Sequence, residues 1–244
     1  MTSNNKSILT NTSRGSTAYW SALLSALLLT ACASKPAPPD WQANAFAALK
    51  GFSTAYLSGN TRLAEFELAR AKMEIARTGR ADLMARAELT RCAARVASLE
   101  FDRCAGYQPL AADAGAGEQA YAAFLTGDGA ALNAALLPAH YRALVQQMTA
   151  PQAGNAAAAS HKLEAIEDPL ARLVAAGVLL QGSRLTPVDM EVATETASHQ
   201  GWRRPLLAWL GVQLKRANDA GELEAAARIQ RRIDLVSPAA PGTQ

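Results

Sequence analysis

Histidine, cysteine and aromatic residues are scarce in this chain of 244 residues, which holds three histidines, three cysteines and 6% aromatics. It contains no CxxC or HExxH spacing, no Gly-x-Ser-x-Gly sequence and no Walker-type phosphate loop. Gly115 and Gly117 precede an expected helix but lack the rest of a dinucleotide-binding motif. We therefore predict a protein that is not an enzyme and that has no metal or small-molecule cofactor.

The chain also lacks a large excess of charge of either sign. Its formal net charge is +3, and two of its basic residues, Lys6 and Arg14, lie in the first 31 residues, which hold no acid. The remainder has 22 basic and 21 acidic residues. A nearly neutral chain with interspersed charges has no electrostatic reason to bind nucleic acid, so we expect no such partner.

The hydrophobic run near the N-terminus is too short to cross a membrane. Residues 18–29 form an apolar run of twelve. A helix of that length spans about 18 Å, whereas the core of a bilayer is roughly 30 Å thick. The polar segment before the run carries Lys6 and Arg14. This layout is typical of a cleavable secretory signal and predicts export from the cytoplasm.

The run ends at Leu29-Thr30-Ala31-Cys32, which resembles the lipobox of bacterial lipoproteins. The resemblance implies that residues 1–31 are a signal peptide removed by signal peptidase II. It also implies that Cys32 carries a diacylglyceryl group and an N-acyl chain such as palmitate, and several acyl chains give a stable membrane anchor. The alternative is a cysteine that happens to follow an ordinary signal or membrane anchor.

Residues 32–39 contain three prolines and are expected to form a semi-stiff tether between the lipid and the folded domain. The residue after Cys32 is alanine, whereas in lipoproteins of enteric bacteria an aspartate there is typical of retention at the inner membrane. We therefore predict an outer-membrane lipoprotein that faces the periplasm and has a protein partner in the cell envelope.

Abundant alanine and few β-branched residues favour helices over strands. Apolar residues recur at helical spacing from Asp40 onward, which predicts one all-α domain over residues 40–236 and a disordered tail over 237–244. Thr186 and Asp189 have the spacing of a capping box. The expected helices cover residues 41–58, 61–78, 81–99, 117–126, 129–137, 138–148, 155–167, 169–181, 187–199, 203–220 and 221–236.

The second expected helix carries a regular apolar stripe. Its members recur at spacings of three and four, and they are Leu63, Phe66, Ala69, Met73 and Ala76. Most charged residues of this helix lie off the stripe. The pattern is typical of an amphipathic helix whose stripe faces the core, so we expect these residues to be buried.

Residues 55–60 and 123–128 are similar in sequence and lie 68 residues apart, which is twice the 34-residue period of tetratricopeptide repeats. Small residues at Ala64 and Ala71 also fall where that repeat has them on its second helix. The domain thus weakly resembles tetratricopeptide repeats, which implies stacked antiparallel helical hairpins in an α-solenoid. The alternative is that any antiparallel helix pair with a glycine turn has this pattern.

Two groups of side chains have the spacing of metal ligands. Glu191, Glu195 and His199 recur every four residues on one face of an expected helix, and His161 and Glu164 share a face of another. The alternative for the first group is a solvated face with His199 at a helix C-terminus, where a positive charge is favourable. The second group supplies only two ligands. We favour the solvated face and predict no metal site.

If Cys32 carries lipid, two cysteines remain, Cys92 and Cys104, in a compartment that favours disulfides. On one straight helix they would lie about 18 Å apart and could not bond. The segment from Leu99 to Cys104 leads into Gly106 and can reverse the chain. We predict a disulfide between them; the alternative is a pair of buried free thiols, because Cys92 lies on an apolar face.

Together these features predict a membrane-anchored periplasmic lipoprotein that acts as a non-catalytic helical scaffold or adaptor for cell-envelope proteins. In layout it resembles outer-membrane lipoproteins that use tetratricopeptide-like hairpins as adaptors. One alternative is an envelope hydrolase acting on the cell wall, or its activator, which requires acidic groups that converge in a cleft. A second alternative is a carrier or chaperone for an apolar ligand, which requires an internal cavity.

Overall fold

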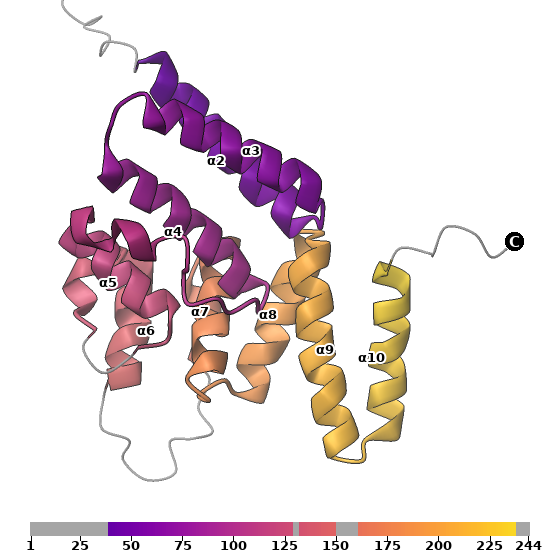
Figure 1. Cartoon of the computed structure of the whole chain (residues 1–244). Helices are drawn as coiled ribbons and strands as arrows, with labels where there is room; N and C mark the ends of the chain where they lie inside the picture. Colours follow the sequence, from indigo (N-terminus) through magenta and orange to yellow (C-terminus); the bar gives the residue numbers. More distant parts are fainter. Residues whose placement is uncertain (1–38, 129–131, 150–160, 238–244) are drawn as a thin grey trace, which may run out of the picture. The chain divides into compact units, whose positions relative to one another are not determined.

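The computed structural model describes residues 39–128, 132–149 and 161–237 (Figure 1). In these residues the regular elements are all helices, without a β-strand, which confirms the predicted all-α class. The expected signal peptide, Cys32, residues 150–160 and the expected tail from residue 238 lie outside the described residues. In the described part of the chain, no helix is both long and apolar enough to cross a bilayer.

The helices follow one another with short connections. The α-helices are α2 (Asp40–Leu57), α3 (Thr61–Ala76), α4 (Ala81–Ala97), α5 (Ala116–Leu125), α6 (Ala139–Thr149), α7 (Pro169–Gln181), α8 (Pro187–His199), α9 (Arg203–Asp219) and α10 (Leu223–Val236). In the described part of the chain, three 3₁₀ helices occur between them, η2 (Gln108–Asp113), η4 (Ala134–Leu136) and η6 (Leu163–Ala165).

Most helix boundaries agree with the sequence-based predictions, since capping residues mark them. The Asn60 side chain accepts a hydrogen bond from the backbone of Leu63, and Asp168 caps α7 in the same way. The predicted capping box is present at α8, where Thr186 and Asp189 bond reciprocally to each other's backbone. These side chains satisfy backbone N–H groups that have no partner within the helix.

The predicted helix at 129–137 is wrong over its described part, where only the short η4 forms. The Asn133 side chain accepts the backbone N–H of Ala135, and Leu137 is extended. Leu137 precedes Pro138, and a residue before proline is sterically kept out of the helical region. These two constraints limit the helix to one turn.

The predicted helix at 155–167 is also wrong for residues 161–167. Lys162 adopts a left-handed backbone conformation with a φ of 52°, which a right-handed helix cannot contain. The backbone N–H of His161 donates to the Asp189 carboxylate 28 residues away. This tertiary contact takes the place of helical bonds, and only η6 forms.

One type of C-terminal cap ends most of the helices. After α2, the N–H of Asn60 donates to the carbonyl of Ala55 five residues back, and Gly59 takes a φ of 87°. After α5, Asp128 donates to Ala123 and Gly127 takes a φ of 72°. This is the Schellman motif, and α4, α7, α8 and α9 end with the same pattern of bonds. The similarity of residues 55–60 and 123–128 therefore reflects a shared helix ending.

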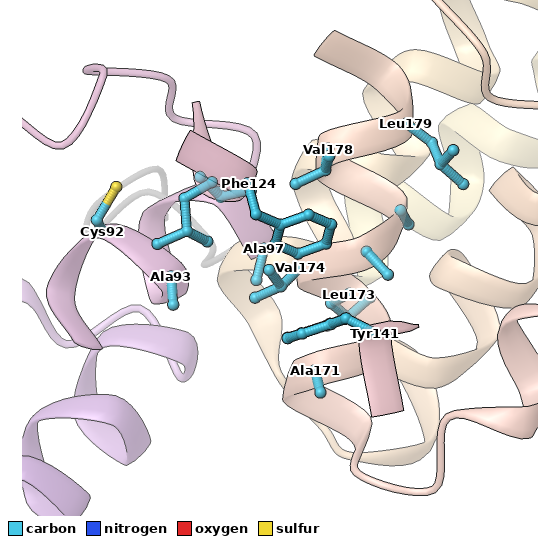
Figure 2. Packing of buried hydrophobic residues seen from close by; sticks show 14 of the residues in the cluster. Cys92, Ala93, Ala97, Phe124, Tyr141, Ala171, Leu173, Val174, Val178 and Leu179 are labelled. Carbon is cyan, nitrogen blue, oxygen red and sulfur yellow. The ribbon is translucent and has the colours of Figure 1, made fainter. Parts of the chain in front are cut away.

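Helices α4 and α7 form the centre of the core, where they cross at very short range. A Cβ atom built on Gly177 of α7 would lie 2.5 Å from the carbonyl oxygen of Val96 in α4. Ala97, Phe124 and Val174 meet beside this crossing (Figure 2). Only glycine lets the two backbones approach so closely, and most of the large buried side chains surround the crossing.

The hairpin of α2 and α3 packs through small residues. The buried positions of α3 are Ala64, Leu68, Ala71 and Ile75, and they meet Phe52 and other apolar residues of α2. Helix α3 also contacts α4, where Lys72 of α3 pairs with the buried Glu88 of α4 at 2.5 Å. Alanines at the contact allow the two helices to lie close together along most of their length (Figure 1).

Arg204 at the start of α9 joins three segments of the chain. Its guanidinium donates to the carbonyl of Tyr56 at 2.8 Å, to the Thr61 hydroxyl at 2.6 Å and to Glu100 at 3.1 Å. It also lies 4.2 Å from the centre of the Tyr56 ring. The turn of the first hairpin is thereby fastened to α9, whose buried Trp209 donates to the carbonyl of Ala97 in α4.

Replacing Gly177 by alanine should destabilise the domain by about 2 kcal/mol, because the new Cβ overlaps the α4 backbone. Gly211→Ala in α9 is the matched control, since a Cβ there meets nothing within 4 Å. That variant should gain about 0.5 to 1 kcal/mol from helix propensity. Urea unfolding followed by circular dichroism measures both, and equal effects of the two variants would contradict the close packing of α4 on α7.

Candidate functional site

The structure brings the two predicted disulfide cysteines together. The sulfur atoms of Cys92 and Cys104 lie 1.99 Å apart, and their Cα atoms lie 5.1 Å apart. The chain reverses as expected, because α4 ends at Ala97 and Leu99 takes a left-handed conformation with a φ of 60°. Both cysteines are buried in the main core, so the pair lies beneath the surface of α4.

Polar contacts hold the loop that carries Cys104. The Asp102 carboxylate accepts the backbone N–H of Cys104 at 3.0 Å and pairs with Arg95 of α4 at 3.0 Å. Arg95 also contacts Glu100, the residue that receives Arg204 from α9. Loop, disulfide and first hairpin are thus connected through one set of charged side chains at the C-terminal end of α4.

His161, a candidate metal ligand in the sequence, binds Asp189 in the structure. Its ring Nδ1 lies 2.7 Å from the carboxylate, which is fully buried and also accepts the backbone N–H and hydroxyl of Thr186. Burial raises the pKa of Asp189, but the hydrogen bonds from His161 and Thr186 outweigh it and hold the pKa below its ordinary value. The carboxylate therefore joins residue 161 to the start of α8.

Glu191, Glu195 and His199 lie on α8 as predicted. Glu195 pairs with Arg232 of α10 at 3.0 Å, and His199 lies in the last turn of its helix. Among the described residues, no three histidine, cysteine or carboxylate side chains come together as they would around a metal ion. Glu195 thus takes part in a contact between helices.

The apolar stripe of α3 faces solvent, so the prediction that it is buried was wrong. Phe66 and Met73 are 62% and 63% exposed, Leu63 is 45% exposed, and Ala69 and Ala76 are exposed as well. The helix buries the opposite side, which carries Ala64, Leu68, Ala71 and Ile75. A second apolar stripe, which includes Leu68 and Ile75, therefore packs into the core, and Phe66 and Met73 remain outside.

Three arginines lie among these exposed apolar side chains. Arg70 pairs with Glu67 at 2.8 Å and Arg77 pairs with Glu74 at 3.0 Å, each one turn back along the helix. Arg62 lies close to the first turn. At about 100° of rotation per residue, the arginines share the side of α3 that carries Phe66, so the expectation that the charged residues lie off the stripe is wrong for them. We call Arg62, Leu63, Phe66, Arg70, Met73 and Arg77 the outer face of α3.

A groove of about 490 Å³ runs beside the outer face, between α2 and α3. Its walls come from Lys50 and small residues of α2 and from Leu63 and Glu67 of α3. Gly51 forms part of the floor, because a Cβ there would lie 3.1 Å from the Glu67 carboxyl. The groove continues the exposed apolar surface from Leu63 toward α2.

A second groove, of about 450 Å³, lies between α4, α5 and η4. Its apolar walls include Leu89, Leu136 and Leu137, and an ion pair between Arg86 and Glu118 at 2.6 Å lines it as well. We call it the α4–α5 groove. No sequence pattern marked it, since its residues come from three separate elements that only the tertiary fold joins.

Tyr121 of α5 also lines the α4–α5 groove and stacks on the buried Tyr141 of α6, with 6.0 Å between the ring centres. Burial raises the pKa of Tyr121 to about 12, so its hydroxyl stays neutral throughout the physiological range. The groove thus combines mainly apolar walls and a neutral phenol with one ion pair. Such a site suits an apolar segment better than a charged substrate.

Comparison of the chain with protein-family models, with curated proteins and with solved structures found no match.

Reduction of the Cys92–Cys104 pair should lower the free energy of unfolding by about 3 kcal/mol, because the bond restricts the unfolded chain. The reduced domain should keep its helix content, since the core around α7 does not depend on the bond. Thermal unfolding with and without reductant measures the effect, and mapping of non-reduced peptides identifies the link. Two alkylatable thiols in protein from the periplasm would contradict the disulfide.

Proposed function

We propose that this chain is a lipoprotein of the outer membrane that faces the periplasm and acts as a non-catalytic helical adaptor for cell-envelope proteins. The anchor is assigned to Cys32 because it follows the lipobox-like Leu29-Thr30-Ala31 and a short apolar run after Lys6 and Arg14. The proline-containing residues 32–39 join this anchor to α2. The buried Cys92–Cys104 pair suits an oxidising compartment outside the cytoplasm.

The α4–α5 groove is the observation that carries the adaptor role. It is open to solvent and its lining includes three leucines, one of which is the exposed Leu136, which suits a short apolar segment of a partner protein. Consecutive helices pack as antiparallel pairs, α2 with α3, α7 with α8 and α9 with α10. This arrangement supports a tetratricopeptide-like stack, a fold type that often presents docking surfaces.

The carrier alternative has some support from the same groove, whose volume lies within the range of small-ligand sites. The groove is formed at the surface, however, and its lining contains an ion pair. The hydrolase alternative requires two carboxyl groups facing each other across a cleft. The acid that lines this groove, Glu118, is paired with Arg86, so we favour the adaptor.

Cys32→Ser should abolish acylation and release the protein from the membrane fraction, or leave an uncleaved precursor, because the serine hydroxyl is not a substrate for lipid transfer in that family. A variant with Cys92→Ala and Cys104→Ala serves as control and should stay in the membrane fraction. Fractionation and intact mass report the outcome. Unchanged fractionation and mass of the Cys32 variant would exclude a lipid anchor at this residue.

A photo-crosslinking residue at position 136 in the full chain should capture one envelope protein in intact cells, because Leu136 lies in the α4–α5 groove. The control position is Leu223 on α10, which is more exposed but lies outside the groove. Thr90→Trp should fill the groove and remove the adduct. Equal capture at both positions would contradict docking in the groove, and a bound apolar small molecule displaced by Thr90→Trp would favour a carrier.

A further inference from the structure

The outer face of α3 has the composition of helices that lie on membranes. It presents two large apolar side chains, Phe66 and Met73, each more than half exposed, and arginines beside them. Two acids of α3, Glu67 and Glu74, lie toward α2. They are largely covered, and they form ion pairs with Arg70 and Arg77. Basic residues that border an exposed apolar stripe are typical of interfacial helices.

A third acid of this helix, Glu65, is exposed but does not lie on the outer face. It precedes Phe66 and so lies about 100° around the helix, on the side toward α4. Lys72 lies on that same side and pairs with Glu88. The charged groups that lie among the apolar side chains of the outer face are therefore guanidinium groups, two of them ion-paired, and such groups complement the phosphates of anionic phospholipids.

The expected tether, residues 32–39, directly precedes the α2–α3 hairpin in the chain. Eight residues, 32–39, separate the proposed lipid attachment from the start of α2 at Asp40, and they can span at most about 28 Å. Helices α2 and α3 run antiparallel, since Ala45 clusters with Ile75 and Gly51 lies against Glu67. The end of α3 that carries Met73 thus lies near the start of α2.

We infer that the outer face of α3 binds the surface of an anionic phospholipid bilayer, as a second contact beside the lipid on Cys32. This inference rests on the proposed anchor, because a short tether holds the face close to lipid and a weak contact then suffices. Phe66 and Met73 enter the interfacial region, and Arg70 and Arg77 exchange their carboxylate partners for lipid phosphates. The domain is thereby oriented on the membrane.

The test uses the mature protein purified from membranes and reconstituted into vesicles of phosphatidylethanolamine and phosphatidylglycerol. A fluorophore on Ala69→Cys reports on the exposed side of α3, and Ala227→Cys on the exposed side of α10 is the matched control. With spin-labelled phospholipid, the fluorescence at position 69 should fall at least twofold, while position 227 should change little. Fluorescence should recover in 0.5 M salt, because salt screens the arginines.

Phe66→Ser with Met73→Ser should remove the quenching at position 69. Leu223→Ser, at a more exposed apolar residue of α10, should leave it unchanged. All three substitutions are at exposed positions, so circular dichroism should show an intact fold. A probe at position 69 that stays unquenched overturns the inference, as does equal quenching at positions 69 and 227 or crosslinking of this face to a protein. The mass of the N-terminal peptide reports separately on the anchor, so the two proposals can fail independently.

Discussion

The close crossing of α4 and α7 at Gly177 is the constraint on which the rest of the domain depends. Because the carbonyl of Val96 occupies the space of a side chain at position 177, the two helices form one compact centre, and α5, α6, α8 and α9 pack around it. A larger residue would separate the helices and open the main core. Interiors are packed too densely to absorb such a shift without loss of stability.

Charged contacts at the C-terminal end of α4 connect the main core to the α2–α3 hairpin. Arg95, Glu100 and Arg204 form a chain of charged contacts that ends on the Tyr56 carbonyl, and burial together with Glu100 raises the pKa of the Tyr56 phenol, so its hydroxyl stays neutral. The hairpin of α2 and α3 is therefore fastened at its turn, while the outer face of α3 stays open to a partner.

The α3 stripe shows why periodicity alone can mislead. The spacing of its apolar residues was read correctly as helical, and the helix begins at Thr61 as predicted. The direction was wrong, because the helix carries a second apolar stripe on its opposite side, which includes Leu68 and Ile75, and that stripe packs against the neighbouring helices. The side with Phe66 and Met73 is instead an exposed surface, which is unusual for large apolar side chains and points to binding.

Local chemistry in the sequence determined the helical class, most helix boundaries, the capping box at Thr186 and the candidate anchor at Cys32, because each depends on residues a few positions apart. The partnership of Cys92 with Cys104 followed from elimination and from a chain reversal of short range. Three features were decided by the tertiary structure alone. His161 bonds to Asp189 and not within a helix, the α4–α5 groove forms, and the α3 stripe faces outward. These features join residues far apart in the chain, and their energies depend on packing distances that no local pattern contains.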